Sequence, residues 1–430
     1  MKRKLSFRLS KPLLIEGRRE WLLFFAAAFT LFLLSLSRQY LQYRTLVSQK
    51  KRAVEAEVLV QYAKTKKGRA YQVLKLHSDA LGKDFFTTSK EPLKNLRGRR
   101  VALLLFPKKV GFVDFLRTPF IPAYILRVLP GQSLRFRLYD HIAAQHPERW
   151  MQELYGALFL ALPVSKDLRQ AVTKLGANHL LALSGFHMGV LWFILYGGLS
   201  LLYRPLQNRF FPWRHRLLDV GAVTVGVLGG YLLLTGMPPS LLRAYAMVVT
   251  GWLALLFGIE LLSFSFLAVC AVALVALIPS LLFSIGFWLS VWGVFSIYQF
   301  LRWTEGWPAW VVFLGLNLWV WLAMLPVVHT LFGTFAPSQL FSPLLTLLFT
   351  LFYPVAMALN LLGAGGLMDG MVMELLRYGA QVPAVTVTLP RWVGGLFVLL
   401  ALFAVRFRVA LYLQMGVMLL FLLYLVEKVA

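Results

Sequence analysis

The sequence predicts a polytopic α-helical membrane protein of about ten spans, with an N-terminal extracytoplasmic small β-barrel domain of the OB-like kind. Of its 430 residues, 59% are hydrophobic and 15% aromatic, and the mean hydropathy is +0.69. A soluble protein of this size has too little core to bury so much apolar side chain. Several apolar runs reach about 20 residues, which is enough to cross a hydrocarbon layer of roughly 30 Å. One early region, in contrast, is basic and built of short strand-like runs.

Net charge and cysteine content narrow the partners and the chemistry. The formal net charge of +26 is high for a membrane protein and predicts a polyanionic partner or anionic lipid. The single cysteine, Cys270, lies in an apolar run. One chain can therefore form neither a disulfide framework nor a cysteine metal cage.

The first unit, 1–37, is expected to be a basic cytoplasmic N-terminus followed by the first transmembrane span. Residues 1–20 contain seven Lys and Arg against two Glu, and 21–36 is an uncharged apolar run. No small-residue cleavage motif follows that run, so we interpret it as an uncleaved span. By the positive-inside rule its basic end stays in the cytoplasm.

The second unit, 38–130, is expected to be an OB-like basic domain outside the cytoplasm. Between 38 and 149 the chain holds 23 Lys and Arg against 8 Asp and Glu, a net charge of +15. A segment longer than about 60 residues crosses the membrane largely regardless of charge, so this basicity does not exclude an outside location. Five strand-like runs separated by turn-rich pieces suit a small closed barrel. These runs are 56–62, 70–76, 85–88, 101–106 and 121–129.

The rest of the chain divides into a linker, 131–175, a transmembrane domain, 176–362, and C-terminal membrane helices, 363–430. In the linker, 150–162 is apolar or amphipathic but too short to span, which predicts an interfacial or re-entrant helix. The candidate spans are 180–202, 217–235, 241–259, 264–277, 281–301, 310–330, 340–362 and a C-terminal pair split by Arg406 and Arg408.

Polar residues first interrupt the apolar sequence at 179–189, where His179, Ser184, Gly185, His187 and Gly189 lie. Charged groups within a span cost roughly 2.5–3.5 kcal/mol, so polar residues there need a reason. Glycines let a helix break, and broken backbone is tolerated at membrane depth where it is buried in protein or lines a wet cavity. In one straight helix, positions 179 and 187 would face broadly the same way, about 80° apart. Either this element lines a pathway, or it is a helix start whose histidines cap or hydrogen-bond neighbouring helices.

Arg243 follows a second interruption, at 235–246. Pro238 and Pro239 break the apolar run, and Ser240 can cap a new helix with Arg243 in its first turn. A cation at that position opposes the helix dipole. Arg243 therefore either has a functional role or snorkels to the membrane interface.

Two further interrupted elements occupy 279–293 and 325–345, and the second contains His329. Each alone is typical of helix packing around prolines and glycines. Four such elements within about 170 residues favour a path through the protein over an inert bundle.

These four segments resemble the ComEC family of competence channels, block by block. GANHLLALSGFHMGVL at 176–191 is similar to the family's G-x-x-HLLAISGLHVGL, and TGMPPSLLRA at 235–244 to its TG-x-x-x-S-x-x-RA. PSLLFSIGFWLSV at 279–291 and LPVVHTLFGTF at 325–335 follow in the family's order. The resemblance extends over about 176–360.

The resemblance implies a channel in the bacterial inner membrane that takes up single-stranded DNA during natural transformation, with the OB-like domain engaging DNA outside. It also implies a periplasmic DNA receptor and a cytosolic helicase-like motor or DNA-processing protein as partners. The expected channel-lining residues are His179, Ser184, Gly185, His187, Arg243 and His329. The first five of them fall on the family's most characteristic positions.

One family feature is missing from this sequence. Many members end in a metallo-β-lactamase-like nuclease domain with a His-x-His-x-Asp-His metal motif. None of the seven histidines here is spaced as His-x-His, so we expect no catalytic centre, metal or cofactor, and a separate nuclease if strands are degraded. No G-x-x-x-x-G-K-[ST] loop occurs either, so a partner or an ion gradient is expected to supply the energy.

The basic domain is expected to contact DNA, because OB-like barrels bind single strands through a cationic groove and aromatic platforms, at about 1–3 kcal/mol per stacked base. Alternatively, its aromatics form the barrel core and its lysines a surface near anionic lipid. A small-solute or lipid-handling permease whose basic domain binds an anionic membrane surface therefore stays open. A membrane enzyme with acid–base histidines is less well supported, because no paired carboxylate is evident. The expected DNA-binding residues are Lys64, Lys66, Lys67, Arg69, Lys75, Arg99, Arg100 and Tyr71.

Overall fold

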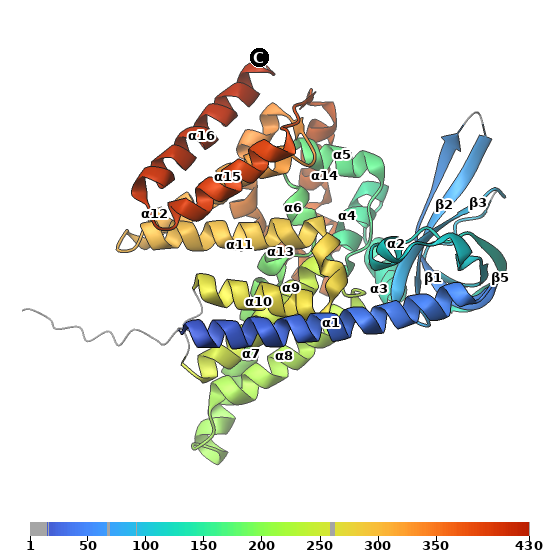
Figure 1. Ribbon diagram of the computed structural model, residues 1–430, viewed down its shortest axis with the longest axis horizontal. Coiled ribbons are helices and arrows are strands. Elements are labelled where there is room, and N and C mark those ends of the chain that lie inside the picture. The colour runs from blue at the N-terminus through green and yellow to red at the C-terminus, as the bar shows by residue number, and fades with distance from the viewer. Residues whose placement is uncertain (1–14, 16, 67–68, 92, 259–262, 430) are drawn as a thin grey trace, which may run out of the picture.

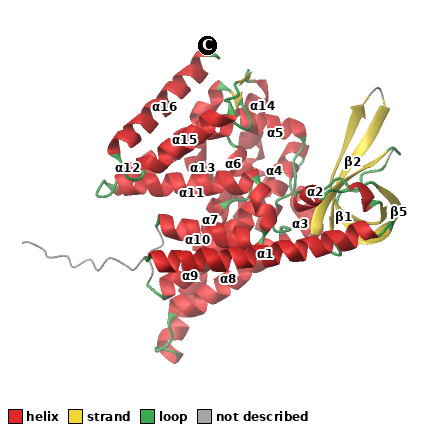
Figure 2. Cartoon of the chain, viewed as in Figure 1, coloured by secondary structure: helices red, strands yellow, loops and turns green. Residues whose placement is uncertain are grey.

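The computed structural model describes residues 15, 17–66, 69–91, 93–258 and 263–429. The basic segment 1–14 and Lys67 therefore lie outside the described residues. A body of helices and a small sheet lie side by side, and the 31-residue helix α1 (Arg18–Ser48) runs along the helices and ends at the sheet (Figures 1 and 2).

The sheet has five antiparallel strands in the order β3-β2-β1-β4-β5. The long first strand β1 pairs with both β2 and β4 and has an irregularity between Val58 and Val60. The two edges of the sheet meet where Phe86 of β3 and Phe120 form a parallel bridge, with Phe86 N donating to Pro119 O at 2.8 Å. All five expected strands are confirmed, with limits that differ by a few residues. They are β1 (Arg52–Lys66), β2 (Arg69–Ser78), β3 (Lys83–Ser89), β4 (Arg99–Leu105) and β5 (Ala123–Gln132).

The C-terminal end of α1 belongs to the core of the sheet domain. Leu46 is 1% exposed and packs with the inward-facing residues Val58, Leu74 and Val101. The Tyr43 hydroxyl donates to Val110 O at 3.1 Å. Because apolar side chains from both elements share one core, the expected first span and the sheet domain form a single packed unit.

The short helices η1 (Pro107–Lys109) and α2 (Phe112–Leu116) lie between β4 and β5 of the sheet domain, and the linker contains α3 (Leu134–Ala143), α4 (Arg149–Leu160) and α5 (Lys166–Lys174). Nine of the twelve residues of α4 are buried, including Glu153, whose carboxylate accepts from Arg149 Nε at 2.9 Å. A helix lying on a membrane surface would leave one face uncovered. Protein covers most of α4, which does not favour a surface location. The interfacial and the re-entrant placement both stay predictions.

Every expected span after the first overlaps a helix, and most agree with it within a few residues, but 180–202 crosses the break between α6 and α7, and α7 continues to Phe210. Among the residues that the structure describes, seven helical segments are long and apolar enough to cross a membrane, namely α1, α7, α8, α9, α12, 337–361 and α16, and α10 and α15 are shorter apolar helices. The count of about ten spans stays a prediction. The helices are α6 (Asn178–Leu181), α7 (Gly185–Phe210), α8 (Arg216–Leu234), α9 (Pro239–Leu256), α10 (Phe264–Leu277), η2 (Pro279–Phe283), α11 (Ile285–Trp303), α12 (Ala309–His329), η3 (Pro337–Phe341), α13 (Ser342–Leu361), η4 (Gly365–Met368), α14 (Asp369–Gln381), α15 (Arg391–Ala404) and α16 (Arg408–Glu427).

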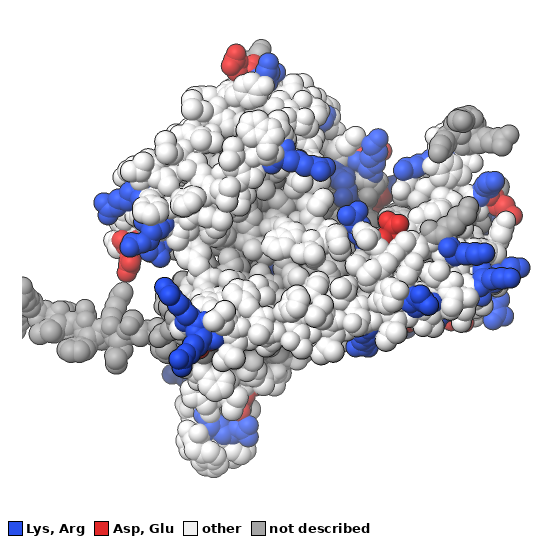
Figure 3. Space-filling view, viewed as in Figure 1, with Lys and Arg blue, Asp and Glu red and all other residues white. Residues whose placement is uncertain are grey.

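Two elements of the C-terminal third were not expected from the sequence. The helix α14 packs against α5, and a two-residue ladder joins β6 (Thr334–Phe335) to β7 (Val385–Thr386). Lys and Arg gather over the sheet domain and at the ends of the helical body, whose visible side is largely uncharged (Figure 3). This distribution fits an apolar belt between two polar ends.

Candidate functional site

A cavity of about 2200 Å³ begins at the sheet domain and continues between α7–α9 on one side and α11–α12 on the other. Its volume exceeds the roughly 300–1,000 Å³ of ordinary small-molecule pockets. The sheet domain, α1, the linker and the interrupted helices all contribute to its wall. The cavity therefore connects the sheet domain with the interrupted transmembrane helices, which the sequence predicts as separate units.

The outer part of this cavity, which we call the mouth, is lined by residues 35–169 and is cationic. Six of its lining residues are Lys or Arg, against three Asp or Glu. Of the expected DNA-binding residues, only Lys75 lies there. The six cations are Arg38, Lys75, Lys83, Arg117, Arg135 and Arg169, and the three acids are Glu57, Asp79 and Asp84.

The acid nearest the mouth cations is neutralised by its neighbours. Asp84 accepts from Lys75 Nζ and lies beside His77 Nδ1, each at 2.7 Å. Burial pushes the pKa of Asp84 upward, but the hydrogen bond from His77 and the charge of Lys75 outweigh it and hold the pKa below its ordinary value. The same hydrogen bond raises the pKa of His77 against the opposing effect of burial.

Lys83 is the mouth cation with the most altered chemistry. Its Nζ donates to Phe115 O at 2.9 Å and lies 4.0 Å from the centre of the Phe115 ring. Burial lowers the pKa of Lys83 to about 8, because removal from water disfavours the charged ammonium. The charge of the mouth therefore changes as the pH rises through that value.

The remaining expected DNA-binding residues that the structure describes lie outside the lining of the cavity. Lys64 and Tyr71 are cross-strand partners near the ends of β1 and β2 that lie away from the helical body (Figure 1). Lys66 and Arg69 pair through their backbones at those ends. Arg99 and Arg100 are exposed at the start of β4, and Arg100 lies 3.9 Å from Asp79.

Inside the bundle, the first interrupted element breaks between α6 and α7. Ser184 is extended, its N–H donates to His187 Nδ1 at 3.3 Å, and the Ser184 hydroxyl lies 3.2 Å from the same nitrogen. These bonds satisfy donors that a new helix leaves free. The break expected at Gly185 is therefore present, with Gly185 as the first residue of α7.

His187 does not line the cavity. It is completely buried against Tyr353 and Phe349, with ring centres 4.6 and 5.5 Å away. Positions 179 and 187 do not share one straight helix, because the break at 182–184 separates them. For His187 the structure agrees with the alternative in which a histidine caps the helix start.

Three other expected residues do lie in the wall. His179 on α6 faces the cavity, and its Nε2 lies 3.0 Å from Thr346 Oγ1 of α13. His329, in the last turn of α12, lines the wall with Nδ1 2.9 Å from Leu325 O. Gly185 lies where an added Cβ would be 3.9 Å from the Cβ of Ala244, so α7 and α9 approach closely at this point.

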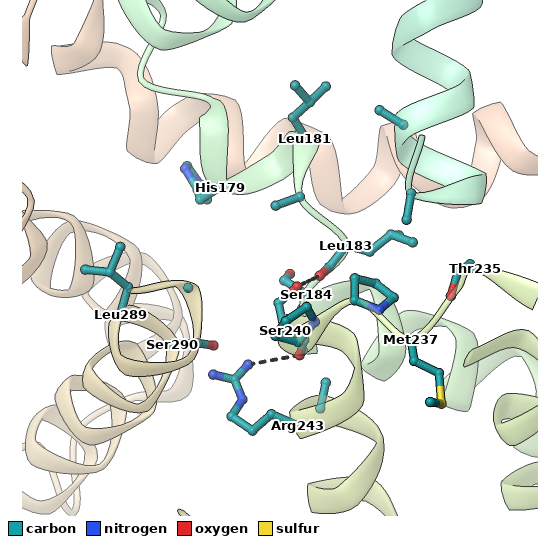
Figure 4. A pocket seen from close by; sticks show the side chains of 18 of the residues that line it. His179, Leu181, Leu183, Ser184, Thr235, Met237, Ser240, Arg243, Leu289 and Ser290 are labelled. Carbon is teal, nitrogen blue, oxygen red and sulfur yellow. Dashed lines mark hydrogen bonds between the residues drawn. The ribbon is translucent and has the colours of Figure 1, made fainter. Parts of the chain in front are cut away.

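The second interruption is tied directly to the first. Gly236 (φ 76°) and Met237 (φ 51°) form a left-handed turn between α8 and α9, which only glycine adopts without strain. Ser240 does not cap α9, because its hydroxyl donates to Leu183 O at 2.6 Å. This bond joins the two breaks at one point in the wall (Figure 4).

This arrangement places Arg243 in the inner part of the cavity, which is lined by residues between 176 and 350. The residue is only 3% exposed, so its guanidinium does not snorkel to an interface. Its Nη2 donates weakly to Ser240 O at 3.5 Å. Nε and Nη1 have no hydrogen-bond partner among the described residues. Ser290 of α11 lies across the cavity from the guanidinium (Figure 4).

Small residues keep the inner part open. Gly189 of α7 and Gly286 and Gly293 of α11 line it, and a Cβ added at any of them would meet nothing within 4 Å. Within the described part of the chain, no three His, Cys, Asp or Glu are grouped to hold a metal ion. The arrangement can therefore pass or hold a flexible anionic molecule along a wall of small, polar and apolar groups.

A model of the competence protein family matches residues 163–428. The chain belongs to the competence protein family. The match covers the helices that form the inner part of the cavity and leaves the sheet domain outside. Uncharacterized protein YcaI of Escherichia coli (strain K12) is 25% identical over 250 residues, which cover 54% of this chain and 32% of that protein. The matched region thus spans about a third of that relative, and no solved structure matches.

Membership of this family and the long apolar helices of the described residues make this chain a multi-pass membrane protein. Sequence reasoning missed the mouth cations Lys83, Arg117 and Arg135. They come from a strand, a short helix end and the linker, and no sequence spacing links them. No sequence pattern distinguishes Arg135 from other arginines. In the structure its guanidinium donates to Leu160 O and Ala161 O, at 2.8 Å each.

Proposed function

We propose that this protein conducts single-stranded DNA across the bacterial inner membrane during natural transformation. One observation carries the proposal: a single cavity leads from a cationic mouth at the sheet domain to the breaks in the helices. Cations at the mouth attract the phosphates of a strand and steer it inward. His179, Ser184, Gly185, Arg243 and His329 are the channel-lining residues of this proposal, and His187 supports the wall from behind.

The sheet domain is the outer DNA-binding module of the proposal. The strand order and the parallel bridge at Phe86–Phe120 support this assignment, because they bring the two edges of the sheet together as a small OB-like barrel would. Such barrels hold single strands with charge and stacking. Lys75 guides the strand at the mouth, while Lys64, Tyr71, Arg99 and Arg100 provide an outer approach.

Partners complete the proposed system. A strand drawn through a passive conduit needs a motor or an ion gradient, so a cytosolic helicase-like or DNA-processing protein would pull it. A periplasmic receptor would deliver the DNA, and a separate nuclease would remove the second strand. Membrane lipid surrounds the apolar belt.

A second function is favoured by the composition of the inner wall. Leu289, Val294, Ile297 and Leu316 line it beside a single cation, Arg243. Such a wall would also suit a lipid with one anionic head group and apolar chains. We therefore retain a lipid-handling or small-solute permease as the alternative.

Deletion of the gene tests the proposal. Labelled DNA is expected to stall in the periplasm of the deletion strain and to enter the cytoplasm again after complementation with the full chain. Normal cytoplasmic entry in the deletion strain would refute the conduit. A deletion that changes lipid distribution while DNA entry stays normal would favour the permease.

The lowered pKa of Lys83 predicts that DNA binding depends on pH. Lysine is charged below its pKa, so the ammonium loses its charge as the pH rises through about 8. Binding of a single-stranded oligonucleotide to the full-length protein in nanodiscs, at fixed low salt, should weaken a few-fold across that value. Lys83→Arg should abolish this pH dependence, because arginine stays charged.

Two variants control the measurement. Lys83→Gln should reduce the slope of log affinity against log salt by about one and leave little pH dependence. Lys108→Gln removes an exposed lysine that lies outside the cavity lining and should leave the pH dependence unchanged. An unchanged pH profile in Lys83→Arg would assign the effect to another group, of which His77 is the nearest at the mouth.

A further inference from the structure

Arg243 is a buried cation whose donors are not used by the protein. Nε and Nη1 lack partners within the described residues, and the bond from Nη2 to Ser240 O is long, at 3.5 Å. A guanidinium has five N–H donors, and buried charges in proteins are normally paired. Arg135 shows the structural use of arginine in the same cavity, because it donates twice to backbone carbonyls at 2.8 Å. The free donors of Arg243 therefore point to a ligand.

The sign of the surrounding charge defines that ligand. Among the lining residues from 176 onward that the structure describes, Arg243 is the only one with a permanent charge. The lining acids all belong to the mouth. An anion entering the inner part therefore meets one cation and no acid, whereas a second cation would meet only repulsion.

Helix ends add to this preference. The first turns of α7, α9 and α11 contribute Gly185, Ser240 and Gly286 to the same lining. A helix N-terminus carries partial positive charge and favours anions. Ser290 of α11 lies opposite the guanidinium and offers a hydroxyl from the other side (Figure 4).

We propose that Arg243 binds one phosphodiester group of the molecule that occupies the cavity, with Ser290 as the opposing donor. This inference rests on the proposed function for the source of the group, which is the backbone of the passing strand. A phospholipid head group carries the same chemistry. The planar guanidinium matches two phosphate oxygens at once. A single fixed cation holds each phosphate weakly enough to release it to the next, as conduction requires.

Variants at Arg243 test the proposal in cells. Arg243→Gln should lower the entry of labelled DNA into the cytoplasm by about tenfold or more, which corresponds to about 1.4 kcal/mol. Arg243→Lys, which keeps the charge without the planar fork, should restore part of the entry. Arg302→Gln is the matched control, because Arg302 is exposed outside the lining and its loss changes the net charge equally. Entry should stay normal in that control.

A DNA strand with uncharged linkages tests directly whether Arg243 recognises the phosphate charge. Wild type should admit a phosphodiester strand better than one interrupted by methylphosphonate linkages, and Arg243→Gln should reduce this preference. Wild-type levels of entry and preference in Arg243→Gln, in cells where deletion blocks entry, would overturn the inference and leave the conduit intact. If Arg243→Gln fails to reach the membrane, Arg243→Lys and Ser290→Val carry the same comparison.

A lipid assay separates the two sources. If deletion leaves DNA entry normal, the conduit fails, and the full chain is then reconstituted in phosphatidylcholine vesicles containing fluorescent phosphatidylglycerol. Slower transfer of the labelled lipid between leaflets by Arg243→Gln than by wild type would support the phosphodiester site with a lipid occupant. Equal transfer by both proteins would overturn it.

Discussion

Replacement of Gly293 by tryptophan is expected to block DNA entry by at least about tenfold, a loss that corresponds to about 1.4 kcal/mol. Gly293 lines the inner cavity, and a Cβ placed there meets nothing within 4 Å. The first atom of a side chain at this position therefore meets no packed atom, and a tryptophan there adds a bulky indole to the wall of the cavity. Helix stability should not suffer, because glycine is the weaker helix former by about 1 kcal/mol relative to alanine. Cytoplasmic entry of labelled DNA measures the effect.

Two variants distinguish a blocked path from a damaged protein. Gly293→Ala adds one methyl group and should retain most DNA entry. Gly395→Trp adds the same indole to an exposed glycine of α15, outside the cavity lining, and should be neutral. Normal entry in Gly293→Trp would show that the strand does not pass this wall.

Replacement of Asp369 by alanine is expected to lower the free energy of unfolding by about 1–3 kcal/mol, because a buried donor loses its acceptor. His146 Nδ1 lies 2.9 and 3.0 Å from the two carboxylate oxygens of Asp369, and its Nε2 lies 3.1 Å from Asn360 Oδ1. The ring stacks on Tyr155 with centres 4.3 Å apart. This cluster fastens the linker to the ends of α13 and α14. The apparent Tm of the purified protein in detergent reports the loss.

Conservative and matched variants sharpen this prediction. Asp369→Asn keeps an acceptor for His146 and should lose less stability than alanine. Asp140→Ala removes an exposed carboxylate of α3 and should leave the Tm unchanged. A Tm for Asp369→Ala equal to that of wild type would show that the buried pair contributes nothing to holding the linker.

Periodicity and hydropathy were enough to find most elements. The strands at 70–76 and 101–106 and the helix at 264–277 were predicted close to β2, β4 and α10 because alternation and apolar length are local properties. The burial of α4, in contrast, depends on segments that are distant in the sequence. Its apolar faces are covered by α14 and other distant segments, and no pattern within 150–162 distinguishes such cover from a membrane surface.

In the candidate site, too, some features could be predicted from local sequence and others could not. Breaks at Gly185 and Pro239 could be foreseen, since glycine, proline and polar residues interrupt a span for local reasons. Whether a residue beside a break faces the cavity depends on which helix covers it. His179 faces it, whereas His187 lies behind the wall under Phe349 and Tyr353 of α13.

By itself, the sequence determined an apolar multi-span protein with a basic strand-rich domain and four interrupted helices. These follow from residue type and spacing along the chain. Only the tertiary structure decided that two strands, α1, the end of α2 and the linker supply the cations of one mouth. It also decided that Arg243 points into the cavity without a partner in the described chain. Proximity between distant segments arises from packing in three dimensions, which no local spacing encodes.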